Sequence, residues 1–179
     1  MPGNEQAAEL FRQIVVPHLA DALALARWLT GSLHDAEDVV QEASIRAFTA
    51  INSYEGRGPR AWLLSIVRNT CFTWLAKNRP HEIVLVGSAA EMDGTELGLH
   101  EDPALDPEAD MIRRADTAAV EAAIAALPQP YREVLVLHDI NGLSYKEIAA
   151  MLSIPIGTVM SRLSRARRLI AAQIGREAP

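Results

Sequence analysis

The stretch that decides the fold runs Leu143-Ser-Tyr-Lys-Glu-Ile-Ala-Ala-Met-Leu-Ser-Ile-Pro-Ile-Gly-Thr-Val-Met-Ser-Arg-Leu163. Ser144 and Glu147 stand three positions apart, which is the spacing of a capping box and predicts the start of a short helix. Ser153-Ile154-Pro155 then forces a turn, because proline lacks a backbone donor and crowds the turn before it. A second helix is expected to begin near residue 156 or 157. The stretch therefore predicts a helix-turn-helix motif.

The second helix of this motif carries side chains suited to DNA. Val159 and Leu163 lie four apart on its expected packing face. The N-terminal half of a recognition helix enters the major groove, so Arg162 and Arg165 are candidates for reading guanine, and the two consecutive arginines that follow suit phosphates. The alternative is that these arginines form only a solvated face. The candidate DNA-binding residues are Thr158, Met160, Ser161, Arg162, Arg165, Arg167 and Arg168.

Charge is distributed unevenly along the chain. The formal net charge is -6, from 17 Lys and Arg against 23 Asp and Glu. Residues 81–110 hold 9 of the acids and no Lys or Arg, with glycines and Asp-Pro pairs that disfavour helix. Residues 160–176 hold five arginines and no acid. This division predicts an acidic linker and a separate basic helix near the C-terminus. A basic helix can bind nucleic acid even though the net charge of the chain is negative.

Length, cysteine content and hydropathy limit the class of protein. A chain of 179 residues that is 49% hydrophobic can fold as one domain or two small ones without disulfide bonds or structural metal ions. Its one cysteine, Cys71, cannot form an internal disulfide and is expected to be a packed small residue rather than a redox sensor. No apolar run reaches the roughly 18 residues of a membrane span, and no signal-peptide pattern is present. We expect a soluble, cytoplasmic protein without membrane insertion.

Three helices are predicted before the acidic segment. Residues 5–30 are expected to be helical with a break near Pro17, and Gly31 ends that helix. Asp35 is the expected N-cap of the second helix, and Pro59 suits the first turn of the third. The apolar stripe of the second helix consists of Ala36, Val39, Val40, Ala43, Ala47 and Ile51.

The predicted fold class is all-α, with two small helical domains. Residues 5–80 form the first domain, residues 81–110 the flexible linker, and residues 111–175 the second domain, in which helix is expected around 111–126 and 131–139. No strand pattern is convincing. The run Ile-Val-Leu-Val at 83–86 could be a short strand or an apolar anchor for the linker.

The first domain carries two polar groups of residues that suggest binding surfaces. One mixes aromatic, basic and amide side chains around a glycine-rich loop, as single-stranded DNA requires, because aromatic rings stack on unpaired bases and basic groups follow phosphates. The alternative is that its tryptophans belong to the core. This group is Ser53, Tyr54, Arg57, Arg60, Trp62, Arg68, Asn69, Trp74 and Lys77. The other group is a polar face suited to an arginine-bearing partner helix or merely to water, and consists of Asp35, Asp38, Gln41 and Glu42.

Two separated motifs resemble those of the extracytoplasmic-function (ECF) sigma factors. Residues 127–135, Leu-Pro-Gln-Pro-Tyr-Arg-Glu-Val-Leu, and the helix-turn-helix after them resemble sigma domain four. Residues 34–42, His-Asp-Ala-Glu-Asp-Val-Val-Gln-Glu, and residues 61–69, Ala-Trp-Leu-Leu-Ser-Ile-Val-Arg-Asn, resemble sigma domain two. The chain departs from the family at Thr73, where many relatives have Asp followed by a denser arginine run. This departure puts the strength of the contacts to the -10 element in doubt.

The resemblance implies a sigma factor that binds core RNA polymerase, recognises promoter DNA at the -35 and -10 elements, and promotes opening of the DNA. The second domain is implied to read the -35 element, and the first to bind the -10 element and the polymerase clamp, with its acidic helix face as the polymerase-binding group. An anti-sigma factor is implied as a further partner. The acidic linker either mimics nucleic acid near the polymerase active centre or serves only as a soluble tether.

Two other classes of function compete with this one. An enzyme is not expected, and neither is a metal or cofactor, because the five histidines lack paired metal spacing and no phosphate- or dinucleotide-binding glycine pattern occurs. A repressor or activator that uses the same helix-turn-helix without polymerase is the stronger rival. It leaves the polar groups of the first domain without a role.

Overall fold

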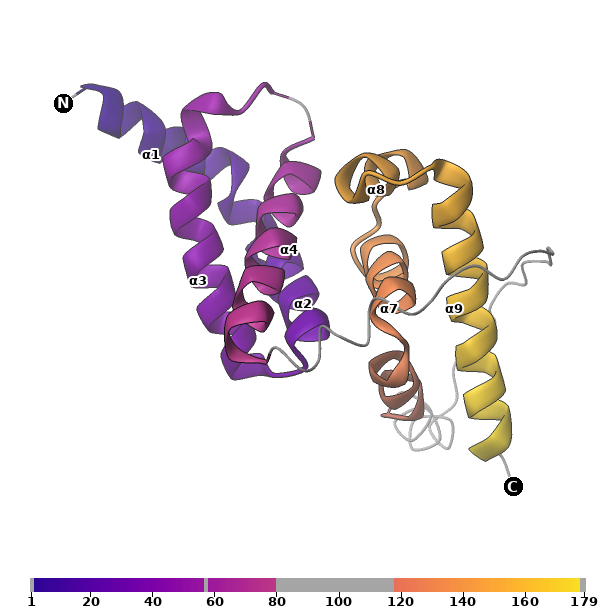
Figure 1. The fold of residues 1–179 in the computed structure, drawn as a ribbon. Coiled ribbons are helices and arrows are strands. Elements are labelled where there is room, and N and C mark those ends of the chain that lie inside the picture. Colours follow the sequence, from indigo (N-terminus) through magenta and orange to yellow (C-terminus); the bar gives the residue numbers. More distant parts are fainter. Residues whose placement is uncertain (1, 57, 80–117, 178–179) are drawn as a thin grey trace, which may run out of the picture.

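The computed structural model describes residues 2–56, 58–79 and 118–177, and the chain is helical throughout these ranges apart from short turns and loops (Figure 1). No strand occurs among them, which confirms the all-α prediction for this part of the chain. The acidic segment 81–110, with its run at 83–86, lies outside the described residues. No helix in the described ranges is long and apolar enough to cross a membrane.

The N-terminal bundle consists of helices α1 to α4. They are α1 (Pro2–Ile14), the 3-10 turn η1 (Val16–His18), α2 (Leu19–Thr30), α3 (Leu33–Ala50), the 3-10 turn η2 (Ile51–Ser53) and α4 (Pro59–Asn78). The predicted break at Pro17 is confirmed, because η1 separates α1 from α2 there. Gly31 ends α2 with a left-handed backbone at φ +72°, and its N–H donates to the carbonyl of Arg27 at 2.9 Å.

The start of α3 differs from the prediction, because its N-cap is Ser32 and not Asp35. Ser32 has an extended backbone, and its hydroxyl accepts from the N–H of Asp35 at 3.3 Å. An N-cap residue lies outside the helical region of backbone angles, whereas Asp35 already stands in the first turn. The predicted apolar stripe is confirmed at Ala36, Val39, Ala43, Ala47 and Ile51, which are buried, and Val40 is half-buried.

Helix α4 begins at Pro59 as predicted, and its central residues enter the core of the N-terminal bundle. Leu63, Leu64 and Val67 are fully buried against α2 and α3, and Cys71 is buried beside them. Trp62 and Trp74 are only half-buried, so they are neither free in solvent nor wholly core.

The C-terminal bundle contains a helix over residues 118–126, followed by α7 (Gln129–Leu135), the π-helical segment η4 (Val136–Ile140), α8 (Tyr145–Leu152) and α9 (Ile156–Glu177). The predicted helix over 131–139 is present, but its last turn widens. Asn141 N–H bonds to the carbonyl of Val136, five residues back, at 2.9 Å. Gly142 then turns the chain with φ +65°.

The two bundles pack against each other through α2 and α4 on one side and α7, η4 and α8 on the other (Figure 1). One continuous cluster of buried apolar residues runs through both. Helix α3 lies on the side of the N-terminal bundle away from α7, and α9 lies on the outer side of the C-terminal bundle (Figure 1).

Candidate nucleic-acid and partner interfaces

The helix-turn-helix has the capping and turn geometry that its sequence predicts. Ser144 N–H donates to Glu147 Oε2 at 2.8 Å, and Glu147 N–H donates to Ser144 Oγ at 3.3 Å, which completes a capping box. The Ser144 hydroxyl also donates to Glu147 Oε2 at 2.7 Å, and this hydrogen bond, together with that from the Ser144 N–H, holds the pKa of the Glu147 carboxyl below its usual value. Ser153 ends α8 with φ +54°, the one positive φ at a residue other than glycine in the described ranges. Ser153 therefore takes the left-handed turn position that glycine commonly fills.

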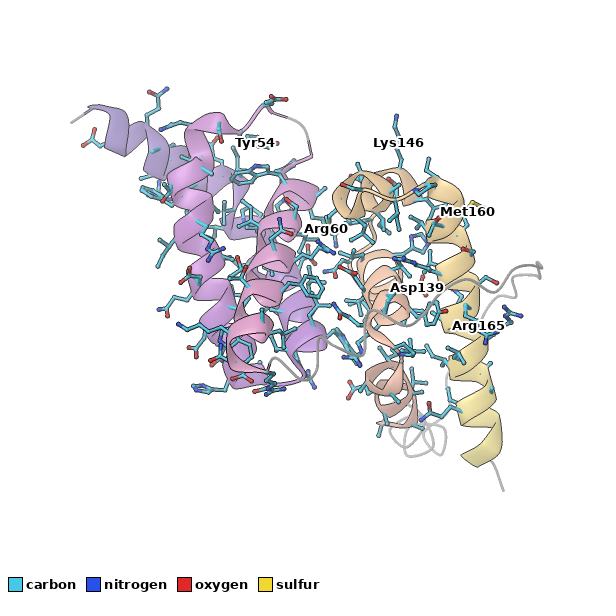
Figure 2. The ribbon with its side chains drawn as sticks, in the orientation of Figure 1. Tyr54, Arg60, Asp139, Lys146, Met160 and Arg165 are labelled. Carbon is cyan, nitrogen blue, oxygen red and sulfur yellow. The ribbon has the colours of Figure 1, made fainter. Side chains whose placement is uncertain are left out.

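Helix α9 turns a packing face inward and an outward face toward solvent. Val159 and Leu163 are buried as predicted. The outward residues stand three, four and three positions apart, so they line one face of the helix. They are Thr158, Ser161, Arg165 and Arg168, of which the last three are exposed and Thr158 is half-buried. Figure 2 shows Arg165 extending from α9 away from the N-terminal bundle.

The other predicted DNA-binding residues of α9 lie on its two flanks. Arg167 donates to Asp139 through Nη2 at 2.7 Å and through Nε at 3.3 Å, and Met160, which lies on the same flank, is 52% exposed. Arg162 lies half-buried on the opposite flank. Burial raises the pKa of the nearby Glu133 carboxyl, and the charge of Arg162 offsets a small part of that rise. The structure thus brings four of the seven predicted residues onto one face and leaves three outside it.

Five of the nine residues in the aromatic and basic group of the N-terminal bundle lie at three separate places. Tyr54 and Trp62 pack together at the start of α4 with ring centroids 5.2 Å apart, and both are half-buried. Trp74, near the other end of α4, has the guanidinium of Arg79 over its ring at 5.7 Å from the centroid. Arg60 and Arg68 lie at the third place, which faces the C-terminal bundle.

The remaining residues of this group are polar and solvent-facing where the structure describes them. Ser53, Asn69 and Lys77 are exposed, and Asn69 Oδ1 accepts from Arg68 Nη1 at 3.2 Å. Arg57 lies outside the described residues.

The predicted acidic face of α3 is only partly available to a partner. Asp38, Gln41 and Glu42 are exposed along one side of the helix. Asp35 instead accepts from Arg79 Nη2 at 2.8 Å, with 17% of its side chain exposed. This ion pair joins the start of α3 to the residue after α4.

Sequence reasoning missed an apolar residue on this same side of α3. Ile45 is 63% exposed and lies three and four residues beyond Glu42 and Gln41, so its side chain continues the polar face. Phe48 follows three residues later, 38% exposed, with its ring 5.6 Å from that of Phe11. The sequence contained a signal for it, because Ile45 is a large apolar residue that lies outside the predicted apolar stripe of this helix.

Candidate metal ligands and the cysteine are the last groups to place in the part of the chain that the structure describes. No group of three His, Cys, Asp or Glu side chains is placed to hold a metal ion there. Cys71 is buried as expected of a packed small residue, and burial raises the pKa of its thiol to about 12. A thiol of that pKa is protonated at neutral pH and a poor nucleophile.

Comparisons with known proteins agree with this geometry. Residues 14–81 match the family model of sigma-70 region 2, and residues 117–170 match that of sigma-70 region 4. The two matches cover α2 to α4 of the N-terminal bundle and most of the C-terminal bundle, and they define a class of protein, the sigma factors of the sigma-70 type.

Individual relatives narrow the class. The chain is 33% identical over 177 residues to the ECF RNA polymerase sigma factor SigW of Bacillus subtilis, covering 96% of this chain and 91% of that protein. It is also 33% identical over 168 residues to the ECF RNA polymerase sigma factor SigE of Mycolicibacterium smegmatis, covering 93% of this chain and 62% of that longer protein. The chain belongs to the family of ECF RNA polymerase sigma factors. It is therefore a promoter-recognising transcription initiation factor and not an enzyme.

A solved structure shares the fold. The sigma factor RpoE of Bartonella quintana, solved in complex with the anti-sigma factor NepR, is 26% identical and aligns with a TM-score of 0.68 over 92% of this chain and 96% of that one. Family membership also decides between the alternatives that the sequence left open, against the enzyme and against the repressor that acts without polymerase.

Proposed function

We propose that this sigma factor reads the -35 element with the outward face of α9. The observation that carries the proposal is the alignment of Thr158, Ser161, Arg165 and Arg168 on one side of a helix that follows a capped α8 and a tight turn. A helix presented in this way fits the major groove, where arginine can donate two hydrogen bonds to guanine. Three further predicted residues lie beside this face and are expected to contribute less to DNA binding: Met160, Arg162 and Arg167.

The -10 element is assigned to the start of α4 and the loop before it. The Tyr54 and Trp62 pair offers partly exposed aromatic surface on which an unpaired base can stack. Asn69 and Lys77 are exposed further along α4 and can follow the strand. Trapping an unpaired base stabilises the opened DNA, so melting is promoted without any chemistry by this chain.

The polymerase-binding surface is assigned to the exposed side of α3. Asp38, Gln41 and Glu42 supply acceptors for basic side chains, and Ile45 supplies an exposed apolar anchor beside them. Asp35 is placed outside this surface, because its carboxylate is paired with Arg79. The helix presents its other side to the core, so the surface rests on a rigid support.

The domain division and the partners complete the proposal. We assign residues 5–80 to domain two, 81–110 to the acidic linker and 111–175 to domain four. The working place is the cytoplasm, where the polymerase is. An anti-sigma factor is proposed as a regulator, because the similar sigma factor of Bartonella quintana was solved with one bound.

Transcription with purified core polymerase tests the assignment of α9. The wild-type chain is added to core enzyme that lacks sigma, with a promoter library from the source genome as template. We expect transcripts from discrete start sites. An Arg165→Ala, Arg168→Ala double variant should lower them at least tenfold, whereas Arg12→Ala, which removes an exposed arginine from α1, should not. Equal transcription by all three proteins argues against α9 as the reader.

Binding to core polymerase tests the assignment of α3. The variants Glu42→Lys and Ile45→Ala should each weaken the complex with core enzyme several-fold in a fluorescence titration. Glu121→Lys makes the same charge change at an exposed position of the C-terminal bundle and serves as the control. Unchanged affinity in both α3 variants moves the polymerase contact to another surface.

A further inference from the structure

Arg68 of α4 is held by a carboxylate of the other bundle. Its Nε pairs with Glu133 Oε1 of α7, across 65 positions of sequence. The Glu133 side chain is only 6% exposed, and that of Arg68 is 23% exposed. The pair therefore lies within the contact between the two bundles, where water has little access.

Arg60 makes a second approach to the C-terminal bundle from the start of α4. Its Nε lies 2.8 Å from Asp21 Oδ2 of α2, an ion pair that is not aligned as a hydrogen bond. Its Nη1 lies so close to Gly142 that a Cβ there would be 3.4 Å away. The charge of Arg60 also acts to lower the pKa of Glu147 in α8. Figure 2 shows Arg60 between the two bundles.

A buried amide adds a directional contact beside these arginines. Asn141 is fully buried, and its Nδ2 donates to the backbone carbonyl of Asp21 at 3.0 Å. Asn141 belongs to the turn that places Gly142 against Arg60. The contact between the bundles is thus specified by polar groups as well as by apolar packing, which favours one closed arrangement over many.

The arginines used in this contact are among those that the sequence assigns to promoter DNA. A guanidinium binds carboxylates and phosphates with the same donors, and a donor engaged by one is not free for the other. From this overlap we infer that the free sigma factor is autoinhibited. In the free protein Glu133 binds the Arg68 guanidinium, and in the initiation complex a phosphate of the opened strand binds it instead. The inference rests on the proposed role of α4 in binding the -10 element.

Two features suit this contact to a reversible switch. Burial raises the pKa of the Glu133 carboxyl despite the neighbouring arginines, so keeping its charge in the interface costs free energy that the pair only partly returns. The pair therefore adds more to the specificity of the closed form than to its stability. Helix α3, which carries the proposed polymerase-binding surface, lies on the side of the N-terminal bundle away from α7 and α9 (Figure 1). The residues of this surface are exposed in the closed form, so core enzyme can bind that form and then open it.

The distance between the bundles in the free, full-length protein tests closure directly. Spin labels are placed at two exposed positions, Glu37→Cys on α3 and Ala171→Cys on α9, in a Cys71→Ala background. We expect one narrow distance distribution for this protein. Glu133→Arg and Arg68→Glu should each give a broad distribution shifted to longer distances. Combining the two changes restores opposite charges and should restore the narrow distribution.

Matched variants separate opening from misfolding. Glu121→Arg reverses an exposed charge of the C-terminal bundle and should leave the distribution narrow. Helix content by circular dichroism should be the same in all variants. If Glu133→Arg lowers it, Glu133→Gln, which keeps the shape of the side chain, takes its place. A wild-type distribution as broad as that of Glu133→Arg, or no recovery in the charge-swapped protein, overturns the inference.

A binding measurement connects closure to DNA. Glu133→Gln should bind a single-stranded oligonucleotide that carries the -10 sequence at least threefold more tightly than wild type, and Glu121→Gln should not. Equal binding by wild type and Glu133→Gln overturns autoinhibition. The transcription assay with core polymerase reports separately on the proposed function: absent transcripts with a narrow label distance defeat the promoter assignments and leave closure standing.

Discussion

Arg167 of α9 and Asp139 of η4 are joined by two hydrogen bonds, at 2.7 and 3.3 Å. The residues lie 28 positions apart in the sequence, and the pair joins α9 to the segment that precedes the helix-turn-helix. This pairing raises the pKa of the Arg167 guanidinium. An arginine that the sequence assigns to DNA phosphates is therefore engaged inside its own bundle.

The pairing predicts that Arg165 and Arg167 respond differently to alanine. Arg165→Ala should lower promoter-directed transcription about tenfold or more, because a lost guanine contact costs about 1–3 kcal/mol, and should leave the melting temperature unchanged. Arg167→Ala should lower the melting temperature slightly, since a partly exposed pair contributes at most about 1 kcal/mol. Thermal unfolding and run-off transcription measure the two effects. A larger transcription defect in Arg167→Ala contradicts this division.

Cys71 is predicted to be protected from thiol reagents in the folded protein. Burial raises the pKa of its thiol to about 12, so the reactive thiolate is scarce near pH 8 and access is blocked. Its reaction with Ellman's reagent should be at least about a hundredfold slower than that of an introduced Ala171→Cys thiol on the exposed side of α9. Denaturant should make the two thiols equally reactive. Fast labelling of native Cys71 contradicts the packed position.

The capping box of α8 is predicted to contribute stability that depends on pH. The folded protein holds the pKa of Glu147 below its ordinary value, so the ionised carboxylate stabilises the folded state. That contribution is complete above the ordinary carboxyl pKa and is lost as the pH falls through the lowered folded-state value. Glu147→Gln should therefore lower the urea midpoint near pH 7 more than near pH 3. A constant difference at the two pH values contradicts the assignment.

Ser144 supplies the other half of the box and provides a change without charge. Ser144→Ala should cost about 1 kcal/mol of unfolding free energy, the usual value of an N-cap side chain. Urea unfolding followed by circular dichroism measures it, and Ser161→Ala on the exposed side of α9 is a control that caps nothing. Equal loss in both variants contradicts a specific cap.

Gly142 and Gly31 make a matched pair for testing the turn next to Arg60. Both have a left-handed backbone, at φ +65° and +72°, so alanine should cost each about 1 kcal/mol of stability. A new Cβ at Gly31 meets open space, and one at Gly142 lies 3.4 Å from Nη1 of Arg60, which is an ordinary van der Waals contact with the end of a flexible side chain. Both variants should therefore keep the wild-type label distance between the bundles. A longer distance in Gly142→Ala alone contradicts this and shows that Arg60 cannot yield to the new methyl group.

Helices and their ends were largely predictable from the sequence because the signals are local. Pro17, Gly31, Pro59 and the capping box act through the backbone of their own neighbours, and each has the predicted effect. The error at the start of α3 is also local: Ser32 competes with Asp35 for the same role and takes it. The widened turn of η4 had no signal in the residue pattern.

The sequence predicted the types of residue in the candidate binding surfaces, but it predicted much less well which of them are free to contact a partner. The residue pattern predicted the arginine-rich helix after the turn, but the pairing of Arg167 with Asp139 depends on how η4 packs against α9. The acidic side of α3 was found, while its exposed Ile45 was passed over because an apolar residue was assumed to be buried. Composition cannot show which polar groups partner one another across distant segments.

The sequence by itself determined that the chain is helical, where its helices begin and turn, and that two separate motifs belong to one sigma factor family. These properties depend on backbone preferences and on residue types within a few positions. Only the tertiary structure decided which charges are free, because Asp35, Arg68 and Arg167 meet partners 44, 65 and 28 positions away. Such contacts arise when packed helices bring distant side chains together, so they cannot be predicted from the residues within a few positions along the chain.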